Sequence, residues 1–101
     1  MAQNKKYEVE SWGTKYEVTT EVTTYLKPKR VALQLWCDEG PFATVSVNLP
    51  NEKLTNERCF FVDTNNCPWA KDFLEKNEIA KPTGNLGFSG FCVYPEYELL
   101  I

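Results

Sequence analysis

Apolar and polar residues alternate with a period of two through the first half of the chain. From residue 15 to 26, one parity carries Tyr16, Val18, Thr20, Val22, Thr24 and Leu26, and the other carries Lys15, Glu17, Thr19, Glu21, Thr23 and Tyr25. A period of two with many β-branched residues is typical of a half-buried strand. We therefore predict a long strand over residues 15–26 with the Val18 parity on the core.

The same alternation resumes beyond Pro28, in two runs that a turn separates. One parity of the first run carries Val31, Leu33, Leu35 and Cys37, and one parity of the second carries Ala43, Val45, Val47 and Leu49. The tetrad 38–41, Asp-Glu-Gly-Pro, is a strong turn signal. The pattern predicts an antiparallel hairpin with a four-residue loop. A second hairpin is expected around residues 11–14, because the tetrapeptide Lys-Tyr-Glu-Val occurs at 6–9 and again at 15–18.

The second half of the chain predicts one helix between strands. Residues 50–57 are polar and predict a loop, and residues 58–62 predict a short central strand. Asn65 and Asn66 are expected to cap a helix of about three turns, with Pro68 in its first turn. Its apolar face would carry Ala70, Phe73 and Leu74, and Asn77 would end it. Residues 81–90 predict a loop or the bulged start of a strand, 91–94 a final strand closed by Pro95, and 96–101 a tail.

These elements predict an α+β fold. We expect an antiparallel β-meander sheet of about five to six strands, with one short α-helix packed on one face. With 101 residues, the chain has the size of one domain. We assign residues 1–101 to a single domain and expect residues 1–5 to be flexible.

The residue inventory argues against catalysis. The chain has no histidine, which removes serine and cysteine mechanisms with a histidine base and zinc sites that contain histidine. The four cysteines (Cys37, Cys59, Cys67 and Cys92) include no Cys-x-x-Cys pair, so we expect no metal and no cofactor. Cys67 is the best candidate nucleophile because it starts the predicted helix. A cysteine that fills space is the simpler interpretation, and we expect a protein that is not an enzyme.

Charge and hydropathy limit the partners and the compartment. The formal net charge is −3, and Lys27, Lys29 and Arg30 form the only basic cluster. Nucleic-acid binding normally needs a basic face, so we expect no direct contact with nucleic acid. No apolar run approaches eighteen residues, which argues against a membrane span. The first residues lack the apolar segment of a signal peptide, so we expect a cytoplasmic protein with reduced thiols.

Acidic and tyrosine residues near both ends suggest a recognition surface. Candidate protein-binding residues are Glu8, Glu10, Glu17, Glu21, Tyr94, Glu96, Tyr97 and Glu98. Exposed tyrosines can anchor a protein partner, and carboxylates can steer its approach. The alternative is that these acids form an ordinary solvent-facing surface.

Several segments resemble a family of short bacterial proteins that carry a domain of unknown function, found in Gram-positive genomes, plasmids and phages. These segments are residues 31–35 (VALQL), 39–44 (EGPFAT), 47–50 (VNLP), 61–66 (FVDTNN) and 87–95 (GFSGFCVYP). The resemblance covers about residues 17–97, and the first sixteen residues fall outside it. It includes no catalytic motif, and it implies an accessory role in a mobile genetic element.

Two hypotheses of function follow. The first is a non-enzymatic protein-binding module of mobile-element type. Its partner would be a host or mobile-element protein, and a host defence nuclease would make the chain an anti-CRISPR-like inhibitor. The second is a self-associating structural or regulatory module, a homodimer that pairs through a strand edge near residues 17–25.

Overall fold

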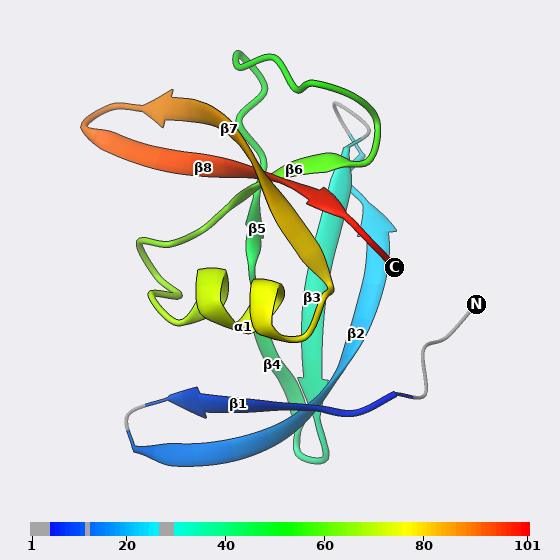
Figure 1. Cartoon of the computed structure of the whole chain (residues 1–101). Coiled ribbons are helices and arrows are strands. Elements are labelled where there is room, and N and C mark those ends of the chain that lie inside the picture. Colours follow the sequence, from blue (N-terminus) through cyan, green and yellow to red (C-terminus); the bar gives the residue numbers. More distant parts are fainter. Residues whose placement is uncertain (1–4, 12, 27–29) are drawn as a thin grey trace.

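The computed structural model describes residues 5–11, 13–26 and 30–101, and it contains two four-stranded antiparallel sheets and one helix (Figure 1). The strands are β1 (Tyr7–Ser11), β2 (Thr14–Thr24), β3 (Val31–Cys37), β4 (Gly40–Thr44), β5 (Ser46–Val47), β6 (Cys59–Val62), β7 (Ala80–Ser89) and β8 (Cys92–Leu99). The helix is α1 (Ala70–Lys76). The predicted α+β class is confirmed. The single sheet of five to six strands was wrong, because the strands divide between two sheets.

The first sheet has the order β1-β2-β3-β4. The long strand β2 serves two neighbours in turn: its first part, up to Val18, pairs with β1, and residues 19–24 pair with β3. Its core parity is confirmed at Val18 and Thr20, but Tyr16 and Val22 on the same parity are exposed. The hairpin between β3 and β4 is also confirmed, although its loop is shorter than four residues because Gly40 and Pro41 belong to β4.

The second sheet has the order β5-β6-β8-β7. All four residues of β6 are buried, which confirms the predicted central strand. β7 and β8 form a long hairpin whose register shifts between Pro82 and Leu86. Of the two alternatives for residues 81–90, a loop or the bulged start of a strand, the second is therefore present. The predicted tail was wrong: β8 continues through Pro95 to Leu99 and pairs with β6 at residues 96–98.

Val45 joins the two sheets at the point where β4 gives way to β5. Its backbone N–H donates to the carbonyl of Leu33 in β3 at 3.0 Å, and its carbonyl accepts from the N–H of Asp63, just beyond β6, at 2.8 Å. Its side chain is fully buried. One residue therefore carries the main-chain hydrogen bonding from the first sheet to the second.

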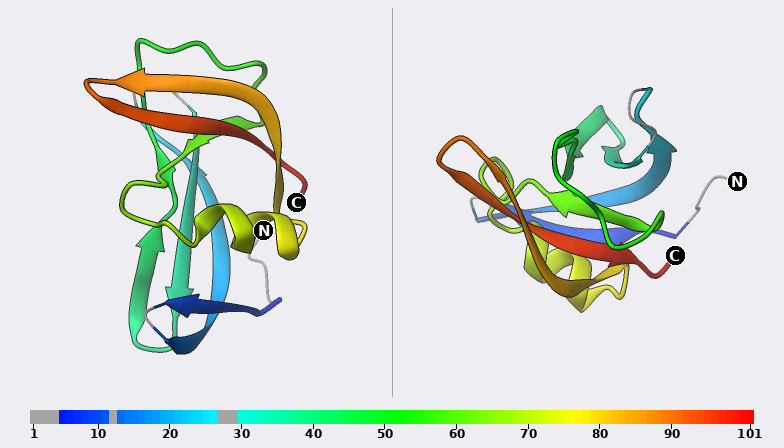
Figure 2. Two further views of the ribbon diagram at one scale, coloured as in Figure 1. Left: turned by 60° about the vertical axis from the view of Figure 1, so that its left-hand side comes forward. Right: turned by 90° about the horizontal axis from the view of Figure 1, so that it is seen from above.

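The helix covers the core between the two sheets, between the β1–β2 hairpin and β7 in two views (Figures 1 and 2). Ala70, Phe73 and Leu74 form its buried face, as predicted. It has only seven residues, and its N-cap is Trp69, which makes no side-chain capping bond. Capping by Asn65 and Asn66 was wrong, because Asn66 bonds to the Asp63 carboxylate in the preceding turn.

Most buried residues belong to one core that both sheets and the helix share. Its largest members include Leu33, Leu35, Phe60, Leu74 and Tyr97. A second, smaller cluster lies under the β7–β8 hairpin and consists of Leu49, Phe61 and Tyr94. Of residues 1–5, which were expected to be flexible, residues 1–4 lie outside the described residues. Lys27 and Lys29 of the basic cluster also lie outside them.

Candidate functional site

The four acids predicted near the N-terminus all lie on the surface. Glu8, Glu10, Glu17 and Glu21 are exposed. Three of them have partners: Lys15 is 3.9 Å from Glu8, Lys6 is 3.4 Å from Glu17, and the indole N–H of Trp36 donates to Glu21 at 3.1 Å. Exposed pairs of this kind contribute about 0–1 kcal/mol each to stability. These acids are therefore free to serve as a charged surface.

The predicted residues at the C-terminal end are placed differently. Glu96 and Tyr97 are completely buried, Tyr94 is nearly so, and Glu98 is half-buried. The premise that they form an exposed recognition surface was wrong. The reason is that β8 runs on beyond Pro95 and inserts between β6 and β7. Pro95 is tolerated because it pairs with β7 at Leu86, beyond the segment that β6 covers.

Glu96 is a buried carboxylate with a complete set of hydrogen-bond donors. Its Oε2 accepts from the backbone N–H of Thr55 at 2.8 Å. Its Oε1 accepts from the hydroxyls of Thr55 at 2.6 Å and Thr83 at 2.5 Å, and from the Asn85 amide at 3.3 Å. Burial by itself raises the pKa of Glu96, but these donors together outweigh burial and hold that pKa below its ordinary value. The charge therefore fixes the loop of residues 50–57 to β7.

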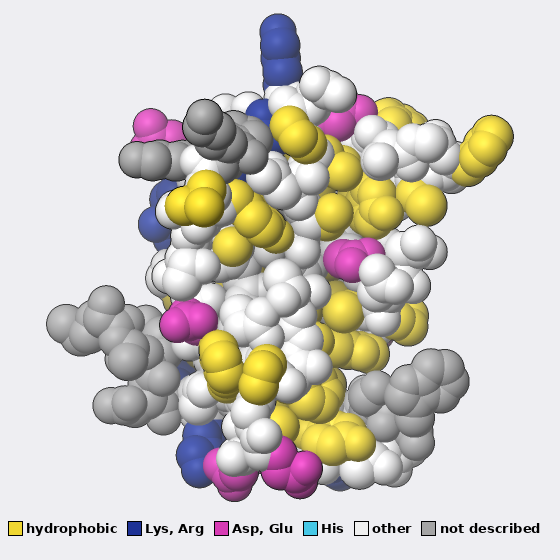
Figure 3. Space-filling model, turned by 180° about the vertical axis from the view of Figure 1, so that it is seen from behind, with side chains coloured by type: hydrophobic (Ala, Val, Ile, Leu, Met, Phe, Trp, Pro, Cys, Tyr) yellow, Lys and Arg dark blue, Asp and Glu magenta, His cyan; other side chains and the backbone are white. Residues whose placement is uncertain are grey.

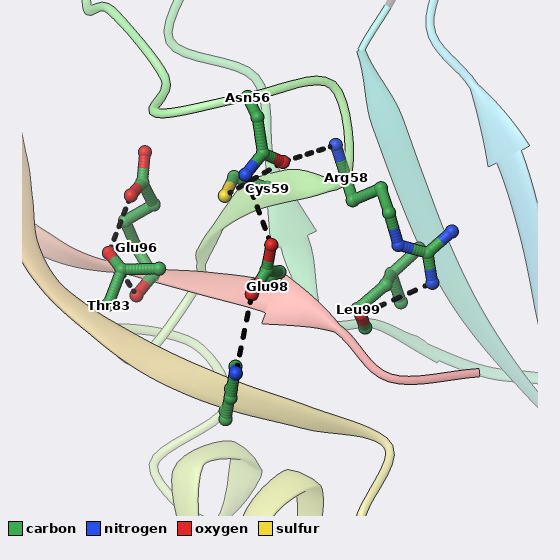
Figure 4. A network of polar contacts seen from close by, with 8 residues as sticks. Asn56, Arg58, Cys59, Thr83, Glu96, Glu98 and Leu99 are labelled. Carbon is green, nitrogen blue, oxygen red and sulfur yellow. Dashed lines mark hydrogen bonds and ion pairs between the residues drawn. The ribbon is translucent and has the colours of Figure 1, made fainter.

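A neighbouring group of polar contacts fixes the end of the same loop to the C-terminal strand (Figure 4). The amide of Asn56 donates to Glu98 at 3.0 Å, and Glu98 lies 3.7 Å from Lys81. The guanidinium of Arg58 donates to the carbonyls of Leu99 at 3.2 Å and Ile101 at 2.8 Å. These contacts and those of Glu96 therefore hold the loop of residues 50–57 and the C-terminal strand together.

The distal part of the β7–β8 hairpin projects from the body and exposes apolar side chains. We call it the arm, and its four exposed apolar residues are Leu86 (54% exposed), Phe88 (57%), Phe91 (108%) and Val93 (47%). Phe88 pairs with Val93 across the strands. The arm is seen to project in Figures 1 and 2, and Figure 3 shows apolar side chains gathered over it at the upper right.

The other face of the arm is packed against the body, which fixes the direction of the exposed face. Gly87, between Leu86 and Phe88, is buried, and an added Cβ there would lie 2.6 Å from the Phe61 ring and 2.9 Å from Leu49. The two strands are joined by Gly90 and Phe91, and Gly90 has a φ of 59°. Glycine at the first position of a two-residue turn is typical of type II′. This turn places Phe91 at the tip.

Each backbone edge of the arm lacks one free N–H group for the addition of another strand. On the β7 side, the N–H of Phe88 donates to the Glu52 carboxylate at 2.8 Å. On the β8 side, Pro95 has no N–H to offer. Carboxylates and prolines at strand edges are common protections against edge pairing. A partner would therefore meet the side chains of the arm and not its backbone.

Cys67 is buried beside Asp63, and its thiol lies 3.9 Å from the carbonyl of Thr44. Burial, with a smaller contribution from the Asp63 charge, raises the pKa of Cys67 to about 11. The thiolate is the reactive form, so its population at neutral pH is very small. The geometry favours a space-filling role for Cys67.

Alkylation with iodoacetamide at pH 7.5 checks this. Because so little thiolate is present, Cys67 is expected to react on the order of 100-fold more slowly than a free-thiol peptide. Peptide mass spectrometry resolves the sites, and the half-buried Cys92 provides an internal comparison. A Cys67 rate equal to that of the peptide would contradict the assignment.

Comparison with known proteins places the chain in a family. Residues 19–101 match the family described as Domain of unknown function (DUF4313). The chain belongs to this family. The arm and the Glu96 network lie inside the matched region, whereas β1 and Glu17 lie outside it. No curated protein and no solved structure matches the chain.

The described residues also show neither a membrane-spanning helix nor a metal site. They contain no helix long and apolar enough to cross a membrane. Within that same part of the chain, no three histidine, cysteine, aspartate or glutamate side chains are grouped so that they could hold a metal ion.

The sequence analysis did not predict the arm, because it assigned residues 81–90 to a loop or a bulged strand start and residues 91–94 to a final strand without an exposed apolar face. One signal was available: Leu86 and Phe88 alternate with two small residues, Gly87 and Ser89. When large apolar residues occupy one face of a strand and small residues the other, either face can be the one that packs on the core. Here the Phe61 ring packs against Gly87, where no Cβ is present. Leu86 and Phe88 therefore face the solvent.

Proposed function

We propose that this DUF4313 protein is a non-enzymatic protein-binding module and that the arm is its contact surface. The observation that carries the proposal is the exposure of Leu86, Phe88, Phe91 and Val93 on one projecting hairpin. Taking about 150–200 Å² for a large side chain, the four expose roughly 400–500 Å² of apolar surface. Patches of about 300–600 Å² are the largest on ordinary monomers and are often functional.

The shape of the arm favours a different protein over a second copy. A standard interface buries about 800 Å² on each partner, and its centre is the more apolar part. The arm can supply that centre only to a concave partner that surrounds it, because Phe91 stands fully exposed at the tip. Two convex arms packed on each other would bury much less. The partner we propose therefore has an apolar cleft that receives Phe91.

A finer proposal concerns the biological setting. The resemblance to mobile-element proteins, the small size and the net charge of −3 support an inhibitor that occupies a host defence nuclease, in the manner of anti-CRISPR proteins. The self-association alternative relied on a strand edge at residues 17–25. In the structure β1 pairs with β2 only as far as Val18, and residues 19–24 pair with β3. Self-association through the other edge of residues 19–24 therefore remains the alternative proposal.

The test compares the wild-type protein with Phe88→Ser/Phe91→Ser. The control is Leu26→Ser, since Leu26 is 90% exposed far along the chain from the arm. Cross-linking pull-downs from a lysate of the host, quantified by mass spectrometry, are expected to recover a partner with the wild-type and control proteins and at least tenfold less with the arm variant. Equal recovery by all three proteins would overturn the proposal. So would light scattering that shows a dimer abolished by the arm variant.

A further inference from the structure

The strand β1 keeps one backbone edge unpaired. It is the first strand of its sheet, and β2 is its only strand partner. In the part of the chain that the structure describes, no hydrogen bond joins the backbone of Glu8 or Glu10 to anything outside the β1–β2 hairpin. An open edge of this kind offers N–H and C=O groups to an added strand. Unlike the arm, it carries no proline, and no carboxylate is bonded to its N–H groups.

The helix α1 runs beside this edge (Figures 1 and 2). Side chains of β1 and α1 line a groove between the two elements. The groove holds a cavity of about 200 Å³. Its walls are Glu8, Val9 and Glu10 from β1 and Trp69, Asp72, Phe73, Lys76 and Asn77 from the region of α1. Pockets for cofactors and drug-sized ligands are typically about 300–1,000 Å³. The cavity is therefore of the size for a side chain of a peptide that lies along the groove.

The walls of the groove favour a positively charged side chain. The walls carry the carboxylates of Glu8, Glu10 and Asp72 and the ammonium of Lys76, and the Lys15 ammonium lies 3.9 Å from Glu8. With Lys15 counted, the net charge at the groove is −1. The ring of Trp69 is half-buried in edge-to-face contact with Phe73, with centroids 5.9 Å apart. A cation over a tryptophan face gains about 0.5–2 kcal/mol, and arginine does so most often. The groove thus combines charge complementarity with an aromatic wall.

We propose that the groove between β1 and α1 binds an extended basic segment of a partner protein, which adds as a strand to β1. The backbone of the segment bonds to the open edge. An arginine or lysine side chain enters the cavity, where it meets Glu8, Glu10 and Asp72 and lies against Trp69. Main-chain bonds of this kind provide affinity, and the pocket selects the side chain. This site is separate from the arm and does not depend on it.

The experiment uses a fluorescein-labelled peptide of ten alternating arginine and valine residues. Fluorescence anisotropy with the whole protein at moderate salt measures binding. The same peptide with an N-methyl group on every backbone amide keeps the charge but has no N–H group with which to pair along a strand. We expect the N-methylated peptide and a glutamate–valine peptide each to bind at least tenfold more weakly. Equal binding of the parent and N-methylated peptides, or no binding of either, would overturn the proposal.

Protein variants locate the site. Glu8→Gln/Glu10→Gln is expected to weaken binding of the arginine–valine peptide at least tenfold. The control Glu39→Gln/Glu57→Gln removes the same charge at two exposed acids outside the groove and should change binding less than twofold. An equal loss in both would show general attraction only, and the proposal would fail. The arm variant Phe88→Ser/Phe91→Ser should bind the peptide like wild type, so this result is independent of the function proposed for the arm.

Discussion

Replacing Glu96 by glutamine is expected to lower the free energy of unfolding by about 3 kcal/mol at pH 7, because hydrogen bonds to a buried charge contribute about 1.5–3 kcal/mol each. The side chain keeps its size, but one oxygen becomes an NH₂ group. In one orientation this group meets the Thr55 N–H, and in the other it meets the Asn85 amide. Either way a buried donor faces a donor. Urea unfolding of both proteins measures the difference.

The destabilisation should depend on pH in a defined direction. The pKa of Glu96 is lower in the folded protein than its ordinary value, which is about 4.3 in the unfolded chain. Its contribution is therefore complete above about pH 4.3 and is lost as the pH falls through the lower folded pKa. The difference between wild type and Glu96→Gln should be constant from pH 7 to pH 5 and should shrink below pH 4.

Glu98 offers a matched control on the same strand. It is half-buried and contacts Asn56 and Lys81, so Glu98→Gln should cost less than about 1 kcal/mol. If both glutamines cost the same, or if the loss at Glu96 did not change with pH, the buried carboxylate would not be the anchor of the loop.

Replacing Gly87 by alanine is expected to destabilise the protein by about 2 kcal/mol, a typical cost of overpacking. The new Cβ would lie 2.6 Å and 2.8 Å from two atoms of the Phe61 ring and 2.9 Å from Leu49. Phe61 is itself buried in β6 and has little room to move. For a domain of this size, the midpoint of thermal unfolding should fall by roughly 10 °C.

Ser89→Ala provides the comparison for Gly87. Ser89 lies two residues after Gly87, on the same face of β7, and its side chain is exposed. The change to alanine removes a hydroxyl and adds no atom. Its midpoint should stay within about 2 °C of wild type. A Gly87→Ala protein as stable as wild type would mean that β7 does not approach Phe61 this closely, and the outward direction of the arm would then lose its support.

The sequence predicted the buried residues best in elements with one buried face and one solvent-exposed face. In β3 the buried set Val31, Leu33 and Leu35 follows the predicted parity, because burial on one side imposes the period. The helix face of Ala70, Phe73 and Leu74 was predictable for the same reason. The prediction that Asn66 caps the helix was wrong because two local interactions compete for Asn66. Its backbone N–H donates to the Asp63 carboxylate in a turn.

The division into two sheets could not be read from periodicity. β4 and β5 share one alternation from Ala43 to Leu49, and only the change of partner at Val45 separates them. The candidate site failed in a similar way. Pro95 predicted the end of the strand at residue 95. In the structure, however, β8 continues and pairs with β6, and this pairing buries Glu96 and Tyr97. Such contacts link residues far apart in sequence, and a local pattern does not contain them.

Val45 has a consequence for how the molecule comes apart. Its N–H is held by one sheet and its carbonyl by a residue adjoining the other, so neither sheet can lose its strands without freeing a buried polar group in the other. Exposing such a group in an apolar interior costs on the order of 1–3 kcal/mol. We therefore expect the amide proton of Val45 to exchange with a free energy close to that of global unfolding.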